Sequence, residues 1–534
     1  MTLRILALLV LAAASLQAQV TYDRILNADR EPHNWLSYSR TPMNQRYSPL
    51  TQITAENAKD LQQQWVWQAR SLEKFEATPL VVDGVLYTVE APNNVVALDA
   101  ATGRPFWTFN YTPLPEARAC CGRVNRGVAI LGDTLYLGTI DAFLVAIDAK
   151  SGRQIWKSKV AEAKGGYSIT HNPTIVKDKV IVGTGGGDGP IRGYISAFDA
   201  KTGEEAWRFY TIPGPGEPGH ETWAGESWRV GGVGVWNAGA YDPELNLVYF
   251  GTGNPAPDWD GSTRRGDNLY SDSVVALDAD TGRLRWHYQF TPHDELDYDA
   301  TQVPVLVDME WDGRPRALML WANRNGVMYV LDRATGEFLK GKPYVKTNWF
   351  DGFDATGRPN RVKFPTPDGT VIYPHVHGGT NWAPPAFSPR TGLFYVATWE
   401  NSGILSVTGQ FPRPAPGPNT RQTSMGNTNL LPFYNNDDEA YGVVRAYDPH
   451  TLDQRWEFKL GDITWGGTLA TAGDVVFSGG RDGYFLALDA RTGALLWKAS
   501  VGGQINSAAM SYAVNGTQYV AIAAGNALFA YALP

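Results

Sequence analysis

The sequence predicts an all-β protein, an eight-bladed β-propeller. Three observations predict this fold. A strand-turn-strand unit recurs along the chain, its copies mostly stand about one blade of 40 to 50 residues apart, and Trp and Tyr number 19 and 25 among 534 residues. With 43% apolar residues the chain can bury a large core. We therefore expect one closed ring of sheets rather than several separate domains.

The repeated unit is typical of a β-hairpin. Its first strand alternates apolar residues and ends on Asp, its turn reads Asp-x-x-Thr-Gly in most copies, and its second strand usually ends on Trp. Gly suits a positive φ in the turn, the Asp carboxylate can accept turn N–H groups, and Trp offers a flat surface to the next blade. The copies are residues 95–107, 144–156, 195–207, 274–286, 328–340, 444–456 and 485–497.

The eighth blade is predicted from a weaker copy of the unit. Residues 384–399 are expected to form it, residues 240–254 resemble a hairpin with a different turn, and seven blades is the alternative. Because each blade buries its faces against two neighbours, no blade is stable alone and the ring must close. The sequence thus predicts one domain over residues 19–534.

The N-terminal residues 1–18 are typical of a secretory signal peptide. Arg4 supplies the positive start, residues 5–14 the apolar stretch, and Ala14 or Ala18 a small residue for cleavage. The apolar run is too short to cross a bilayer, which needs about 20 residues, and no later stretch is long and apolar enough. We therefore expect a periplasmic protein that does not span the membrane.

Charge and cysteine content narrow the function. A net charge of -8 argues against nucleic acid as a partner, because that requires a basic face. The only cysteines, Cys120 and Cys121, exclude a CxxCH haem site in this sequence and any Cys-based zinc site. These two residues can pair with each other, pair between molecules, or remain buried thiols, and spacing alone leaves all three open.

Several polar residues stand where a propeller core would prefer apolar ones. In the run HDELDYDATQ, Asp297 and Asp299 are expected on one face of a strand, about 6 to 7 Å apart. Two like charges directed into one cavity need a cation between them, and a solvated loop is the alternative. Asp188, Asn254 and Arg324 are scattered along the chain. The oxygen donors among them suit a hard ion such as calcium.

Over essentially all of the mature sequence, the chain resembles the PQQ-dependent methanol and ethanol dehydrogenases, in their soluble type without a haem domain. The resemblance rests on ordered motifs rather than on the propeller repeat. These motifs are EATPLVVDGVLY from Glu76, CCGRVNRG from Cys120, THNPTIVKDKVIVG from Thr170, GGVGVW to Trp236, YDPELNLVYFGTGN to Asn254, TPHDELDYDA around Asp297 and NRNG around Arg324.

The resemblance implies a site for pyrroloquinoline quinone (PQQ). Cys120 and Cys121 would form a vicinal disulfide over one face of the planar quinone, and Trp236 would cover the other. Arg126 would offer its bidentate fork to one of the cofactor's carboxylates. The cofactor-binding positions of the family correspond here to Glu76, Cys120, Cys121, Arg126, Thr170, Gly186, Gly187, Trp236, Arg324, Asn381 and Trp465.

The resemblance also implies one metal ion, held by Asp188, Asn254, Asp297 and Asp299. In the family, an Asp at the position of Asp299 accompanies lanthanide use, so a lanthanide(III) ion is favoured and Ca²⁺ is the alternative. Three carboxylates beside an anionic cofactor are also better neutralised by a trivalent ion. One departure is that the family usually has Glu where this chain has Asp188, which is shorter by one methylene.

The implied activity is oxidation of primary alcohols to aldehydes. Asp297 would be the general base, Arg324 would stabilise the developing negative charge, and hydride would pass to metal-activated PQQ. Electrons would leave to a soluble cytochrome c. A non-catalytic propeller scaffold and a PQQ-dependent sugar or polyol dehydrogenase are the alternatives. A homodimer is neither required nor excluded, since a closed ring has no exposed sheet edge.

Overall fold

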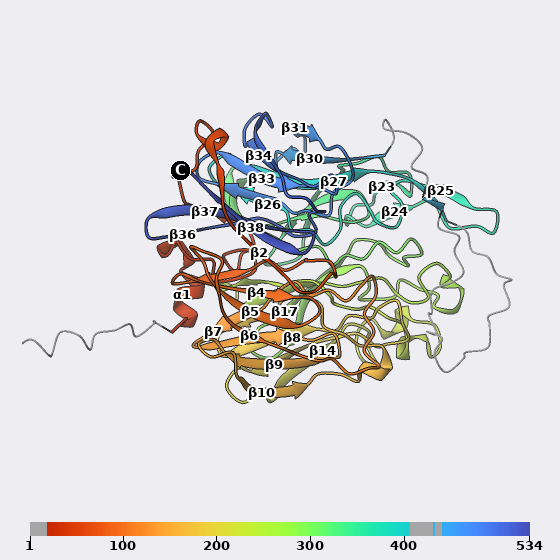
Figure 1. Cartoon of the computed structure of the whole chain (residues 1–534). Helices are drawn as coiled ribbons and strands as arrows, with labels where there is room; N and C mark the ends of the chain where they lie inside the picture. The colour runs from red at the N-terminus through yellow and green to blue at the C-terminus, as the bar shows by residue number, and fades with distance from the viewer. Residues whose placement is uncertain (1–18, 406–430, 433–439) are drawn as a thin grey trace, which may run out of the picture.

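The structure, a computed structural model, describes residues 19–405, 431–432 and 440–534. In this part of the chain, eight sheets of four antiparallel strands form the blades of a propeller (Figure 1). The predicted fold class is confirmed. The predicted signal peptide, residues 1–18, lies outside the described residues, so its assignment stays a prediction.

The first four blades follow one another along the chain. Blade 1 contains β3 (Leu80–Val82), β4 (Val85–Glu90), β5 (Asn94–Asp99) and β6 (Pro105–Phe109); blade 2 contains β7 (Ala129–Leu131), β8 (Thr134–Gly138), β9 (Phe143–Asp148) and β10 (Gln154–Lys159). Blade 3 contains β11 (Thr174–Val176), β12 (Lys179–Gly183), β13 (Tyr194–Asp199) and β14 (Glu205–Tyr210); blade 4 contains β15 (Ala240–Asp242), β16 (Leu247–Gly251), β17 (Ser273–Asp278) and β18 (Leu284–Gln289).

Blades 5 to 7 continue this order. Blade 5 contains β19 (Val305–Trp311), β20 (Arg314–Ala322), β21 (Val327–Asp332) and β22 (Phe338–Pro343); blade 6 contains β26 (Ala386–Ser388), β27 (Leu393–Glu400), β30 (Tyr441–Tyr447) and β31 (Gln454–Lys459). Blade 7 contains β32 (Leu469–Thr471), β33 (Val475–Gly479), β34 (Tyr484–Asp489) and β35 (Leu495–Ser500), with β1 (Tyr47–Ser48) added in parallel to β32.

The eighth blade joins the two ends of the described chain. β36 (Met510–Val514), β37 (Thr517–Ala524) and β38 (Ala527–Ala532) pair with β2 (Gln62–Gln68), which lies beside β38 in Figure 1. The prediction that residues 384–399 form a separate eighth blade is wrong, because they supply β26 and β27 of blade 6. The true eighth blade lacks the repeated turn, so the motif could not find it.

The repeated turn behaves as its residues predict. In blade 1, Asp99 accepts hydrogen bonds from the backbone N–H groups of Ala101 and Thr102. Gly103 has a φ of 71°, and a Cβ there would lie 2.6 Å from the indole of Trp65 in blade 8. The same Trp-on-Gly contact joins neighbouring blades at Trp107–Gly152, Trp156–Gly203, Trp207–Gly282, Trp286–Gly336 and Trp456–Gly493. Through these contacts the indole rings pack neighbouring blades against each other.

Elements outside the blades are short. The helical segments are α1 (Tyr22–Leu26), η1 (Ala28–Arg30), η2 (Ala58–Asp60), η3 (Ala163–Gly165), η4 (His220–Thr222), η5 (Ser227–Arg229) and η6 (Gly261–Thr263). Two small sheets contain β23 (Phe350–Phe353) with β24 (Pro359–Arg361), and β25 (Thr370–Ile372) with β28 (Gly403–Leu405) and β29 (Leu431–Pro432). Among the described residues, no helix has the length and apolarity to cross a membrane.

The propeller brings many segments to one end. In an antiparallel blade, the start of the first strand and the end of the second lie at the same end. The segment before the first strand of each blade and the connection between its second and third strands therefore meet there. Residues from these two kinds of segment build the site described next.

Candidate active site

One cavity of about 510 Å³ collects the residues predicted for the site. Each of the eight blades contributes to its wall a residue that precedes the blade's first strand. In blade order these are Glu76, Arg126, Thr170, Trp236, Asp297, Asn381, Trp465 and Asn506. Connections between second and third strands add Gly186, Gly187, Asp188, Asn254 and Arg324, and the loop before blade 2 adds Cys120 and Cys121. Every site residue predicted from the sequence, Asp299 included, therefore lines this cavity.

One side of the cavity is built around a buried guanidinium. Arg126 lies 2.8 Å from Glu76 in an ion pair, and its Nη1 donates to Thr170 Oγ1 and to the carbonyl of Trp236, each at 3.2 Å. Its guanidinium stands over the rings of Trp236 and Trp382, at 5.1 and 4.8 Å. Burial raises the pKa of Glu76, which the charge of Arg126 opposes. This arrangement offers a cation and a hydroxyl between flat aromatic walls.

Cys120 and Cys121 form a disulfide. Cys121 is exposed and Cys120 is half-buried. The alternative of two buried thiols is therefore wrong. Both residues line the cavity that Trp236 and Trp465 also line, which gives the cavity several planar, weakly polar surfaces.

A second side of the cavity carries carboxylates. Arg324 donates to Asp297 at 3.0 Å and also to Asp299 and to the carbonyl of Val376. Asp299 Oδ1 accepts from the backbone N–H of Asn254 at 3.0 Å and from the indole N–H of Trp236 at 3.3 Å. Trp236 thus links the Arg126 side of the cavity, through its carbonyl, to the carboxylate side, through its indole N–H.

The predicted strand through Asp297 and Asp299 is wrong. Both lie between β18 and β19 outside any strand, and Asp297 has a φ of 58°. The solvated-loop alternative is also wrong, because Asp299 is only 5% exposed. The carboxylates converge because Arg324 holds them, an interaction that strand periodicity cannot predict.

The carboxylate side fits a bound cation. Asp297 Oδ1 is buried without a hydrogen-bond partner, and burial raises the pKa of Asp297 well above its ordinary value, which Arg324 opposes. Asp258, a residue that the sequence reasoning missed, is fully buried next to Asn254 and also has an oxygen without a donor. Orphaned buried carboxylate oxygens call for a proton or a cation. Oxygen donors of this kind suit a hard metal ion.

Other cavity residues were also missed from the sequence. They are Lys74, Val124, Ser168, Gly185, Trp259, Val376, His377, Trp382 and Asn506. Several precede the first strand of a blade, as the predicted residues do, so aligning the blades by that position could have found them. Burial lowers the pKa of His377 to about 4, and its Nδ1 is buried without a partner, so this ring is neutral at pH 7.

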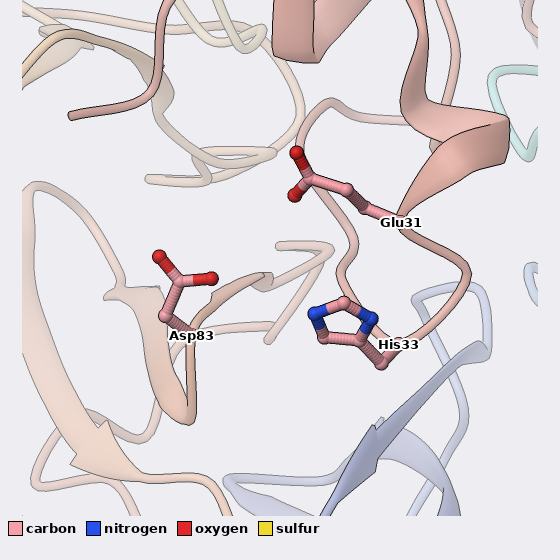
Figure 2. Close-up of side chains that lie close together, drawn as sticks. All are labelled: Glu31, His33 and Asp83. Carbon is pink, nitrogen blue, oxygen red and sulfur yellow. The ribbon is translucent and has the colours of Figure 1, made fainter. Parts of the chain in front are cut away.

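A second group of metal-type ligands lies outside the cavity. Among the described residues, Glu31, His33 and Asp83 alone bring three such ligand atoms within 4.8 Å of one another (Figure 2). The guanidinium of Arg24 binds Glu31 at 2.7 Å and Asp83 at 2.9 Å. Because one guanidinium binds both carboxylates, the group is an ion-pair cluster that fastens the N-terminal segment to blade 1.

Comparison with known proteins places this chain in a family. Residues 35–341 and 438–520 match the model of the PQQ family, the "Glucose/ethanol/alcohol dehydrogenase, beta-propeller domain". The chain is 40% identical to the quinohemoprotein alcohol dehydrogenase ADH-IIG of Pseudomonas putida, over 96% of this chain and 75% of that protein. It is 35% identical to the lanthanide-dependent methanol dehydrogenase of Methylacidiphilum fumariolicum, over 96% and 88% of the two chains.

The solved structures agree with the sequence matches. A europium-containing methanol dehydrogenase superposes with a TM-score of 0.89 at 32% identity, over 96% of this chain and 100% of that one. The family model covers well over half of the chain, and these relatives align along nearly all of it. The chain therefore belongs to the family of PQQ-dependent quinoprotein alcohol dehydrogenases.

Proposed function

We propose that the protein is a periplasmic alcohol dehydrogenase that binds PQQ and one metal ion and oxidises primary alcohols to aldehydes. One observation carries the proposal: the buried Arg126 and the orphaned carboxylate of Asp297 face the same aromatic-walled cavity. A propeller scaffold has no need of such a cavity, since buried charges cost free energy unless function retains them.

The cavity residues divide into two sets by chemistry. Lys74, Arg126, Thr170 and Asn381 supply the cationic and hydrogen-bonding groups that an anionic planar quinone requires, and the disulfide and Trp236 supply its flat walls. Asp188, Asn254, Asp297 and Asp299 supply oxygen donors for the ion. When bound, PQQ with its ion supplies an electrophilic hydride acceptor.

The chain's own residues then act on the alcohol. Asp297 accepts the hydroxyl proton at its orphaned Oδ1, and Arg324 fixes the orientation of that carboxylate through its other oxygen. Arg324 also offers positive charge where negative charge develops on oxygen. Trp259, Val376 and the neutral His377 line the same cavity and exclude water from the substrate.

Three finer assignments belong to the proposal: the ion, the electron acceptor and export. A lanthanide ion is favoured over Ca²⁺ because Asp299 adds a carboxylate to the site, and a lanthanide-dependent relative supports this choice. A soluble cytochrome c is the proposed electron acceptor, in keeping with a sequence that contains no CxxCH haem motif. Export depends on residues 1–18.

The test is reconstitution of the purified protein. Apoprotein is loaded with PQQ and either La³⁺ or Ca²⁺, and dye reduction is followed with ethanol, with methanol, and with glucose and glycerol as polyol controls. We expect activity with primary alcohols, faster with La³⁺. Inactivity with both ions, despite bound PQQ, would overturn the enzymatic proposal. Activity with glucose or glycerol alone would favour a sugar or polyol dehydrogenase.

A further inference from the structure

We infer that Asp258 is a fifth protein member of the metal site, an outer carboxylate that positions Asn254 and sets the preference for a highly charged ion. The inference rests on the proposed function, because it concerns the same ion. Asp258 lies in the connection between β16 and β17, four residues after Asn254.

Asp258 makes one short side-chain hydrogen bond. Its Oδ1 accepts from Nδ2 of Asn254 at 2.7 Å. The only other acceptor of that amide is the carbonyl of Pro255, at 3.4 Å, among the residues that the structure describes. With its nitrogen engaged by Asp258, the amide of Asn254 keeps its carbonyl oxygen available to the cavity. Such outer partners fix the orientation of a metal ligand.

The second carboxylate oxygen of Asp258 indicates that a positive charge belongs beside it. Oδ2 is buried and has no hydrogen-bond partner, and the residue as a whole is 0% exposed. Arg264, on the same connection, donates to the carbonyls of Pro257, Asp258 and Asp294 and to the side chain of Asn268, and it acts on the Asp258 carboxylate through its charge. A buried carboxylate oxygen without a hydrogen-bond donor is costly, so a metal ion in the adjoining cavity would compensate Asp258.

The charge balance of the site favours the same conclusion. The charges of Asp188 and Asp299 act on Asp258, and the charges of these three residues act on Asp297. Arg324 is paired with Asp297 and Asp299, and Arg264 acts on Asp258 through its charge. Asp258 thus adds one more negative charge beside the cavity, which strengthens the attraction for an ion of higher charge.

The test measures ion binding rather than turnover. The full-length protein with bound PQQ is titrated with Tb³⁺, followed by luminescence sensitised by the cavity indoles, and with Ca²⁺ by competition. Asp258→Asn keeps an acceptor for Asn254 but removes the charge, whereas Asp258→Ala removes both. The matched control is Asp260→Asn, which removes one charge two residues further along the same loop.

We expect Asp258→Asn to weaken Tb³⁺ binding by about 10- to 100-fold and Ca²⁺ binding by less, because the lost attraction scales with the ion's charge. Asp258→Ala should weaken both ions further, and Asp260→Asn should match the wild type. Circular dichroism checks that each variant is folded.

Unchanged Tb³⁺ binding in a folded Asp258→Asn variant would overturn the inference and leave the proposed function standing. Equal losses of affinity for Tb³⁺ and Ca²⁺ would overturn the claim that Asp258 acts through its charge. A wild-type protein that holds PQQ but binds neither ion would overturn the metal site itself, and this inference with it.

Discussion

Arg324 donates a hydrogen bond of 3.0 Å from Nη2 to Oδ2 of Asp297 and leaves Oδ1 of that carboxylate without a partner. The same guanidinium binds Asp299 through Nη1. One planar cation thus holds two carboxylates in a fixed relation, and it holds the proposed base by the oxygen that does not react.

Replacing Arg324 by Lys should separate these carboxylates. An ammonium group lacks the planar fork that reaches two carboxylates at once. We expect kcat with a saturating alcohol to fall by about 100-fold or more, with PQQ still bound, as measured by its absorbance. Arg316→Lys serves as the control, because this guanidinium also binds two carboxylates, Asp332 and Glu337, but lies outside the cavity. Wild-type kcat in Arg324→Lys would contradict this role.

Asp299 should contribute both a negative charge to the metal site and a hydrogen-bond acceptor to Trp236. Asp299→Ala and Asp299→Asn should each remove the lanthanide-supported activity, since each removes a carboxylate. Only Asp299→Ala should also weaken PQQ binding, by about 10-fold, because the indole of Trp236 then loses its acceptor. Lanthanide-dependent rates and PQQ titration measure the two effects. Unchanged lanthanide dependence in both variants would exclude Asp299 as a ligand.

The vicinal disulfide should matter for cofactor binding and not for folding. A bond between adjacent residues closes almost no loop, so it removes little entropy from the unfolded chain. The double substitution Cys120→Ser with Cys121→Ser should leave the unfolding temperature within about 2 °C, while PQQ affinity falls by about 10-fold. Calorimetry and PQQ titration check this. A large loss of thermal stability would show that the pair is structural.

The contact between blades can be tested at Gly282. It has a φ of 69°, and a Cβ there would lie 2.5 Å from the indole of Trp207. Gly282→Ala should destabilise the fold by about 2 to 4 kcal/mol, from backbone strain and overpacking together. Gly313→Ala is the matched control, because it has a similar φ of 77° with open space around it. Similar denaturation midpoints for both variants would contradict a contribution from overpacking against Trp207.

The ion-pair cluster at Glu31 should show a pH-dependent stability. Its hydrogen bond from Arg24 lowers the pKa of Glu31 below 4.5. Burial raises the pKa of Asp83, but hydrogen bonds from Arg24 and Asn34 outweigh it and hold this pKa below 3.8. A carboxyl group whose pKa is lower in the folded than in the unfolded protein stabilises the fold at pH values above its unfolded pKa. This stabilisation is lost as the pH falls through the folded pKa.

Arg24→Gln should therefore cost about 1 kcal/mol at pH 7, and the difference from the wild type should shrink below about pH 4. Thermal unfolding measured from pH 7 to pH 3 checks this. Added Ca²⁺ should not restore the variant's stability. A loss that stays constant with pH would show that Arg24 acts through packing rather than charge.

Different parts of the molecule differ in how far the sequence predicts them. The turn at Asp99 to Gly103 is local, so the residue types alone predict its hydrogen bonds and its positive φ. Blade 8 has no such turn, and it forms from β2 and β38, which lie at opposite ends of the described chain. The count of eight was predicted from residues 384–399, which belong to blade 6, so no local pattern predicted blade 8 itself.

By itself, the sequence determined the propeller, through hairpins whose turn residues act locally, and it determined which polar residues would meet, through a family resemblance. Only the tertiary structure decided how they meet. Arg324 joins Asp297 to Asp299, and Trp236 donates to Asp299, across separate loops without regular structure. Contacts of this kind depend on where separate loops lie after the ring has closed, and no periodicity in the chain records that.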